Sequence, residues 1–145
     1  PKAGGKRKGI LVFTRFLKEA ERLTMSIPGC VIVSGDTPKK ERERILEMFK
    51  VGEIPVVANV GVLTTGFDYP ELDTVVMARP TMSLAMYYQI VGRCIRPYKG
   101  KTAWFVDLCG NINRFGEVSD LHLKDTGNGK WAVFSKGRQL TNVRF

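Results

Sequence analysis

The sequence is poor in metal-binding residues and in long apolar runs. Its 145 residues include one histidine and three cysteines, Cys30, Cys94 and Cys109, which form no C-x-x-C pair. We therefore expect core cysteines, no metal site and, because free thiols suit a reducing compartment, a cytoplasmic location. No apolar stretch approaches the roughly 18 residues of a membrane helix, and no signal peptide is visible.

Acidic residues are scarce relative to basic ones. The 14 Asp and Glu residues are outnumbered by 23 Lys and Arg residues, which gives a net charge of +9. Such a surplus suits an anionic partner such as nucleic acid, although a solubilising surface would have the same composition. Lys39, Lys40, Arg42 and Arg44 alternate with glutamates, so a solvated helix face is the favoured interpretation of that segment.

A phosphate-binding P-loop is also missing. Gly4-Gly5-Lys6 contains a glycine–lysine pair, but the pattern GxxxxGK[ST] needs an earlier glycine and a hydroxyl residue after the lysine. Position 7 is an arginine, so we reject this interpretation. Residues 1–9 are predicted to be a basic linker instead.

Short apolar runs alternate with helical stretches over residues 10–112. Strands are predicted at 10–13, 30–33, 54–58, 73–78 and 102–108, and helices at about 17–25, 38–51 and 83–93. Thr37 and Ser83 are expected to be N-caps, with Pro38 at the first helical position. The alternation predicts an α/β fold with a parallel sheet and right-handed crossovers.

Residues 113–145 form a C-terminal extension in which this pattern is lost. Gly127-Asn128-Gly129 lies between two apolar runs, so a β-hairpin is plausible there. The rest of the extension is basic and polar, and its composition indicates no role.

Polar residues follow the predicted strands, and ligands of open α/β sheets bind at the carboxyl ends of strands. Gln89, Arg93 and Arg96 have i, i+4 and i+7 spacing, which places them on one face of a helix that Pro97 would end. Two neighbouring guanidiniums suit phosphate oxygens. The alternative is a pair of surface arginines that form ion pairs with Asp or Glu.

Four segments resemble conserved motifs of superfamily 2 helicases. Gln89–Arg96 resembles motif VI, Leu63–Pro70 resembles motif V, Ile10–Arg15 resembles motif IV, and Ser34–Asp36 resembles the short motif that follows it. Their order and spacing agree with the family over residues 9 to about 113. The resemblance is closest to the RadD-type and restriction-enzyme-type helicases of bacteria and phages. It implies the second, C-terminal lobe, a RecA-like three-layer sandwich with a mostly parallel central sheet.

The resemblance also implies roles for individual residues. Arg93 and Arg96 would act as arginine fingers on the γ-phosphate of ATP bound to the first lobe, and Gln89 would orient the site. Gly66 would let the backbone approach the nucleotide, and Asp68 would accept a hydrogen bond from a ribose hydroxyl. A plain turn residue is the alternative for Asp68.

The residues that match the family's nucleic-acid contacts would touch the phosphate backbone of the strand. They are Thr14, Arg15, Gly35, Thr64 and Thr65. Local loop capping is the alternative role for Thr64. Thr65 stands where some RNA helicases have arginine, so DNA is favoured over RNA. The chain also lacks the family's acidic DExx motif, so Mg²⁺ and ATP would be held by the first lobe, and this chain alone is expected to be inactive. The alternative is a stand-alone RecA-like module that binds nucleic acid or protein without catalysis.

Overall fold

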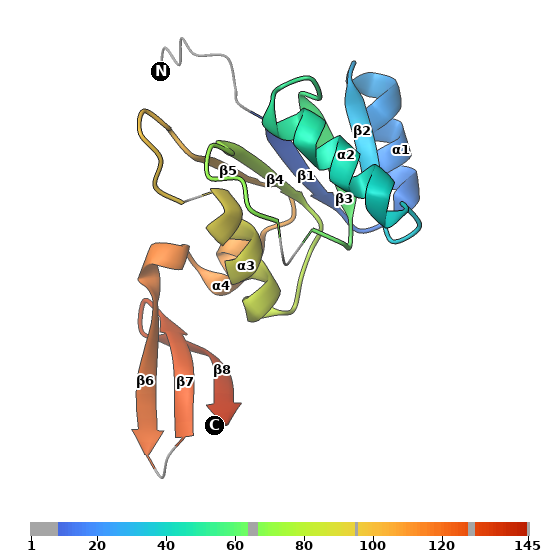
Figure 1. Ribbon diagram of the computed structural model, residues 1–145. Coiled ribbons are helices and arrows are strands. Elements are labelled where there is room, and N and C mark those ends of the chain that lie inside the picture. The colour runs from blue at the N-terminus through green and yellow to red at the C-terminus, as the bar shows by residue number, and fades with distance from the viewer. Residues whose placement is uncertain (1–8, 64–66, 95, 128–129, 145) are drawn as a thin grey trace.

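A computed structural model describes residues 9–63, 67–94, 96–127 and 130–144. A parallel five-stranded sheet forms the centre, in the order β2-β3-β1-β4-β5 (Figure 1). Its strands are β1 (Ile10–Thr14), β2 (Cys30–Ser34), β3 (Val56–Val60), β4 (Thr74–Ala78) and β5 (Trp104–Asp107). The predicted α/β class and parallel sheet are confirmed.

Helices cover both faces of this sheet. They are α1 (Leu17–Ser26), α2 (Lys39–Lys50), α3 (Leu84–Cys94) and the short α4 (Asn111–Phe115). The chain passes from β1 to β2 in one direction along the sheet and returns to β3, so right-handed crossovers place α1 and α2 on opposite faces. Figure 1 shows α2 and α3 together on one side. The result is the expected three-layer arrangement.

The main core lies between the sheet and the α2/α3 layer. Leu11, Phe13, Val57, Val75 and Met77 are at most 1% exposed, and each points into this layer. The rings of Phe49, Phe67 and Tyr69 pack together, with the Phe49 and Tyr69 centroids 5.5 Å apart. This aromatic cluster ties α2 to the segment that follows β3.

Among the predicted boundaries that differ from the structure, two have a clear local cause. Thr37 is not the cap of α2, because its hydroxyl accepts a hydrogen bond from the Ser34 N–H and Pro38 takes the cap position. The third strand begins at Val56 rather than at residue 54, because the Ile54 N–H bonds to the Met48 carbonyl at the end of α2. Pro55, which follows, has no N–H for the ladder.

Two other local predictions are confirmed. The Ser83 hydroxyl accepts a hydrogen bond from the Met86 N–H at 3.2 Å, so Ser83 caps α3. Lys39, Lys40 and Arg44 lie on a solvated face of α2, with the ion pairs Arg44–Glu41 and Lys39–Glu43. Arg42 differs, because it is half-buried and donates to the Thr37 carbonyl. Solvent screens exposed pairs of this kind, so they contribute little to stability.

The C-terminal extension forms a separate antiparallel sheet. Its strands are β6 (Leu121–Gly127), β7 (Lys130–Ser135) and β8 (Arg138–Arg144), and η1 (Val118–Asp120) precedes them. The pairing of β6 with β7 confirms the predicted hairpin. β8 was not predicted, although Lys136 and Gly137 both have positive φ, at 48° and 80°, as a tight hairpin turn requires.

Tyr87 joins α3 to the chain that leads into this small sheet. Its hydroxyl donates to the Gly116 carbonyl at 2.8 Å, and its ring stacks on Phe115 with a centroid distance of 5.2 Å. Burial, followed by the negative charges of Asp107 and Glu117, raises the pKa of Tyr87 to about 12. The folded chain therefore holds the phenol proton more tightly than the unfolded chain.

Tyr87→Phe should lower the free energy of unfolding by about 1 kcal/mol at neutral pH, because one hydrogen bond is lost. The contribution of the wild-type phenol is fully present below pH about 10 and is lost as the pH rises towards 12. Denaturant unfolding at a series of pH values should therefore show a shallower alkaline loss for Tyr87→Phe. Equal slopes in the two proteins would contradict this account.

Candidate functional site

The end of α3 meets the segment that follows β3. Arg93 donates a hydrogen bond from Nη1 to the Phe67 carbonyl, and the Arg96 guanidinium forms an ion pair with the Asp68 carboxylate. Residues about 28 positions apart are thus in direct contact. The structure brings together three of the residues singled out in the sequence, Asp68, Arg93 and Arg96. Gly66 lies outside the described residues.

The electrostatics of this cluster favour an anion. Burial lowers the pKa of Arg93, and the positive charge of Arg96 lowers it further, while Asp68 acts in the opposite direction. Two guanidiniums are therefore near enough to repel, with one carboxylate beside them. The side chains of Arg96 and Asp68 are 44% and 71% exposed, so a ligand can reach both. Arginine forks bind phosphate oxygens well in such a position.

The cluster does not lie at the carboxyl edge of the sheet, where the sequence analysis placed it. The Cys94 thiol donates to the carbonyls of Asp73 and Trp104, which stand at the starts of β4 and β5. A helix that follows a parallel strand runs back along the sheet, and 11 residues of α3 span about 16 Å. Arg93 and Arg96 are thereby carried to the opposite edge.

Lys101 holds this cluster together, and sequence reasoning missed it. Its ammonium group donates to the carbonyls of Cys94 at 2.8 Å, Pro70 at 3.0 Å and Leu72 at 3.1 Å. It therefore binds the last turn of α3 to the segment after Asp68. No feature of the sequence separates Lys101 from Lys99, its neighbour in the same basic turn.

Asn111, which sequence reasoning also missed, fixes the segment that leads into α3. The Asn111 side chain is fully buried; its amide donates to the Arg79 carbonyl and to Asp107, and its oxygen accepts from the Thr81 N–H. Asp107 also accepts from the Ile112 N–H at 2.7 Å. The only available signal was a polar residue four positions after the end of β5.

Thr14, Arg15 and Gly35 lie at the carboxyl edge of the sheet. Thr14 is 1% exposed and its hydroxyl donates to the Asn59 carbonyl at 3.4 Å, so its side chain faces inward. Arg15 is exposed, and a Cβ added at Gly35 would meet nothing within 4 Å, so the backbone is open there. Thr64 and Thr65 lie outside the described residues.

Asn59 shapes the start of the adjoining loop. It is fully buried, and its side-chain oxygen accepts hydrogen bonds from the N–H groups of Val62 and Leu63 at 3.2 and 3.0 Å. These bonds turn the chain as it leaves β3 and fix the backbone at Val62 and Leu63. Sequence reasoning missed this role of Asn59.

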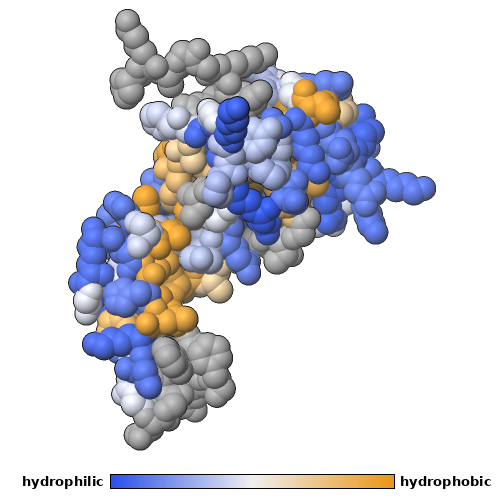
Figure 2. Space-filling model, turned by 60° about the vertical axis from the view of Figure 1, so that its left-hand side comes forward, coloured by the Kyte–Doolittle hydropathy of each residue, from blue (hydrophilic) through white to orange (hydrophobic). Residues whose placement is uncertain are grey.

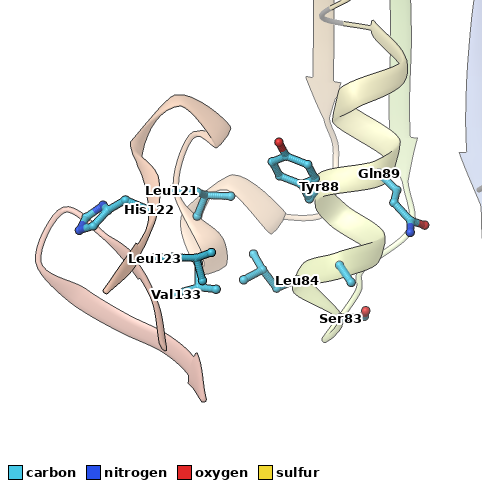
Figure 3. Close-up of a pocket in the computed structure, with 9 residues that line it drawn as sticks. Ser83, Leu84, Tyr88, Gln89, Leu121, His122, Leu123 and Val133 are labelled. Carbon is cyan, nitrogen blue, oxygen red and sulfur yellow. The ribbon is translucent and has the colours of Figure 1, made fainter. Parts of the chain in front are cut away.

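A groove of about 690 Å³ lies between α3 and the small sheet. Figure 3 shows Leu84, Leu121, Leu123 and Val133 pointing toward one another across it, and Figure 2 shows hydrophobic surface gathered in this region. Gln89 is among the lining residues, so the groove adjoins the face of α3 that also carries Arg93. Gln89 itself thus lies at the groove rather than in the Asp68–Arg96 ion pair.

Within the part of the chain that the structure describes, no group of three His, Cys, Asp or Glu side chains could hold a metal ion. No described helix is long and apolar enough to cross a membrane.

Comparison with known proteins supplies the family. Residues 4–98 match the model of the helicase conserved C-terminal domain, which is more than half of the chain. The chain belongs to this family. It is therefore the C-terminal lobe of the kind found in ATP-dependent helicases, and the predicted RecA-like architecture is confirmed.

Relatives of this helicase domain include a 51.5 kDa protein of a Lactococcus phage, 36% identical over 70% of this chain and 23% of that protein. The ATP-dependent RNA helicase DBP3 of Gibberella zeae is 35% identical over 67% of this chain and 17% of that protein. The chain thus spans about a quarter or less of the length of these relatives.

A solved structure, S. cerevisiae Dbp5 bound to RNA and ADP BeF3, shares the fold with a TM-score of 0.58 and 24% identity over 68% of this chain and 27% of that chain. Other relatives are named as RNA helicases and as a DNA 3′-5′ translocase, XPB2 of Sulfurisphaera tokodaii, 32% identical over 71% of this chain and 23% of that protein. These names do not favour DNA over RNA.

Proposed function

We propose that this helicase domain is the second motor lobe of an ATP-dependent helicase or translocase. The observation that carries the proposal is the cluster of Asp68, Arg93 and Arg96, in which the ends of two family motifs are in contact. The cluster has the cations for a phosphate group, and the chain has no P-loop of its own. A partner lobe that holds the nucleotide would complete it.

The side chains of the cluster take separate roles toward the nucleotide. Arg93 and Arg96 hold the γ-phosphate oxygens and stabilise the charge that develops there, while Asp68 accepts a hydrogen bond from a ribose hydroxyl. ATP supplies the phosphoryl-transfer chemistry, with Mg²⁺ held by the other lobe. Gly66 would allow a close backbone approach, and Gln89 would orient the neighbouring groups. The 145-residue chain by itself would hydrolyse no ATP.

The ion pair between Arg96 and Asp68 must open for these roles. Both side chains are accessible to solvent, and exposed ion pairs contribute about 0–1 kcal/mol. Contacts between an arginine and phosphate oxygens exceed this cost, because charge-assisted bidentate hydrogen bonds are the stronger class. The ion pair therefore positions the Arg96 guanidinium and the Asp68 carboxylate, and a bound nucleotide can still separate them.

The nucleic-acid strand would run along the carboxyl edge of the sheet. Arg15 supplies a cation there, Gly35 presents open backbone, and Thr64 and Thr65 would add hydroxyls. Thr14 would support this edge through its bond to Asn59. Contacts to phosphates read no base, which suits a motor that moves along any sequence. The preference for DNA stays a prediction.

Arg15→Ala should weaken binding of a single-stranded oligonucleotide severalfold and reduce the slope of log affinity against log salt by about 0.7, the value of one phosphate contact. Fluorescence anisotropy over a salt series measures both quantities. Arg44→Ala is the matched control, because Arg44 is an exposed arginine that pairs with Glu41 on α2. An unchanged slope for Arg15→Ala would remove Arg15 from the strand path.

A further inference from the structure

Phe16 occupies a position that helix formation does not explain. It is the N-cap of α1, where Ser, Thr, Asp or Asn would accept a hydrogen bond from the first turn. A phenyl ring has no acceptor. The carboxylate of Glu19 instead accepts hydrogen bonds from the N–H groups of Arg15 and Phe16, at 3.0 and 3.1 Å. The start of the helix is thus secured without any contribution from the ring.

Core packing does not explain Phe16 either. The residue is 56% exposed, and Leu17 beside it is 43% exposed. Leu108, which directly follows β5, is 65% exposed. The carboxyl ends of β1 and β5 lie on the same edge of the sheet with only β4 between them. Apolar residues that break local rules without packing in return are expected mainly at functional sites.

Arg15 gives this edge an unpaired cation beside the ring. Its guanidinium carbon lies 5.0 Å from the centroid of Phe16. Within the described residues, no carboxylate forms an ion pair with Arg15. A flat ring and a free guanidinium are therefore presented together, within the span of one nucleotide.

We propose that Phe16 is a stacking platform for a base of a single-stranded nucleic acid whose adjoining phosphate pairs with Arg15. The proposal rests on the strand path proposed above and adds a base contact to it. Aromatic stacking and a neighbouring cation are the usual means of holding single strands, and they tolerate any sequence because every base has a π-face. Phe16 should thus raise affinity without selecting a base.

The test compares oligonucleotides that differ only in their bases. Labelled oligothymidine and oligouridine of about 12 nucleotides are titrated with the chain, beside a strand of equal length whose central sugars are abasic. The wild-type chain should bind both base-bearing strands more tightly than the abasic strand. Phe16→Leu should lose about fivefold to twentyfold in affinity for the base-bearing strands and nothing for the abasic one.

Tyr88→Leu is the matched control, because Tyr88 is 56% exposed, as Phe16 is. Tyr88 belongs to α3 and is far from Arg15 in the sequence. It should bind as the wild-type chain does. Phe16 is exposed, so thermal unfolding should confirm that Phe16→Leu is as stable as the wild-type chain.

Each other result overturns the stacking platform in a distinguishable way. If Phe16→Leu binds all strands normally while Arg15→Ala binds them weakly, the strand path stands and the platform is wrong; Phe16 would then face a protein. If neither substitution changes binding, or the wild-type chain binds no strand, both the platform and the path are wrong. A loss confined to one of the two base-bearing strands would contradict the expected tolerance of sequence.

Discussion

Arg96→Ala should reduce ATP turnover by at least about a hundredfold, with little change in ATP affinity, in a protein that joins this lobe to a P-loop lobe. Arg96 lies just beyond α3, which ends at Cys94, and its side chain is accessible to a ligand. Its guanidinium would meet charge that develops on the phosphate mainly in the transition state, so its loss should lower kcat rather than raise KM.

Arg96→Lys is the matched variant, because it keeps the charge and removes the planar fork. It should recover only a small part of the lost turnover, since a single ammonium does not reproduce bidentate geometry. The measurement is steady-state ATPase activity with and without single-stranded nucleic acid, and the 145-residue chain alone serves as the blank. Turnover near the wild-type value in Arg96→Ala would exclude the finger role.

Asp68 provides a second check in the same assay. Asp68→Asn removes the charge that pairs with Arg96 and keeps the shape of the side chain. If Asp68 binds ribose, the substitution should act mainly on KM, because the ribose contact is equal in the ground and transition states. The contrast between the two substitutions separates a nucleotide-binding role from a role in the chemical step.

The sheet could be predicted from the sequence because its strands are short apolar runs with helices between them. Ile10–Phe13 is mostly buried, and Cys30–Val33 in the edge strand β2 is half-buried except for Val33. The apolar character of both segments does not depend on distant contacts. Errors arose where a local competitor acted, as at Thr37, whose hydroxyl bonds to Ser34 instead of capping α2. The third strand of the extension was missed because its polar residues carry no periodic apolar signal.

The candidate site was only partly predictable, for a different reason. The spacing predicted that Arg93 and Arg96 share one helix face, but α3 ends at Cys94, so Arg96 lies beyond the helix. The spacing also does not say which edge of the sheet the end of α3 reaches. The contact of Arg96 with Asp68 depends on how the segment after β3 packs through Phe67 and Tyr69. Such long-range packing leaves no pattern in the local sequence.

Lys101→Met should lower the free energy of unfolding of the chain by about 2–3 kcal/mol. Its ammonium donates to three carbonyls, and a hydrogen bond to a charged group contributes about 1.5–3 kcal/mol. Lys101 is half-buried, so water would replace some of the hydrogen bonds that the three carbonyls lose. The change in the free energy of unfolding should therefore be smaller than the sum of three bonds. Methionine keeps the length and most of the packing of the side chain.

Lys99→Met is the control, because Lys99 is exposed, lies in the same turn and should change stability by less than about 0.5 kcal/mol. Denaturant unfolding of the two variants gives the comparison. Since Lys101 binds the last turn of α3 to the segment at Pro70 and Leu72, amide exchange should also rise at Cys94 and Leu72 in Lys101→Met alone. Equal stability of the two variants would mean that the core, and not Lys101, holds Arg93 and Arg96 beside Asp68.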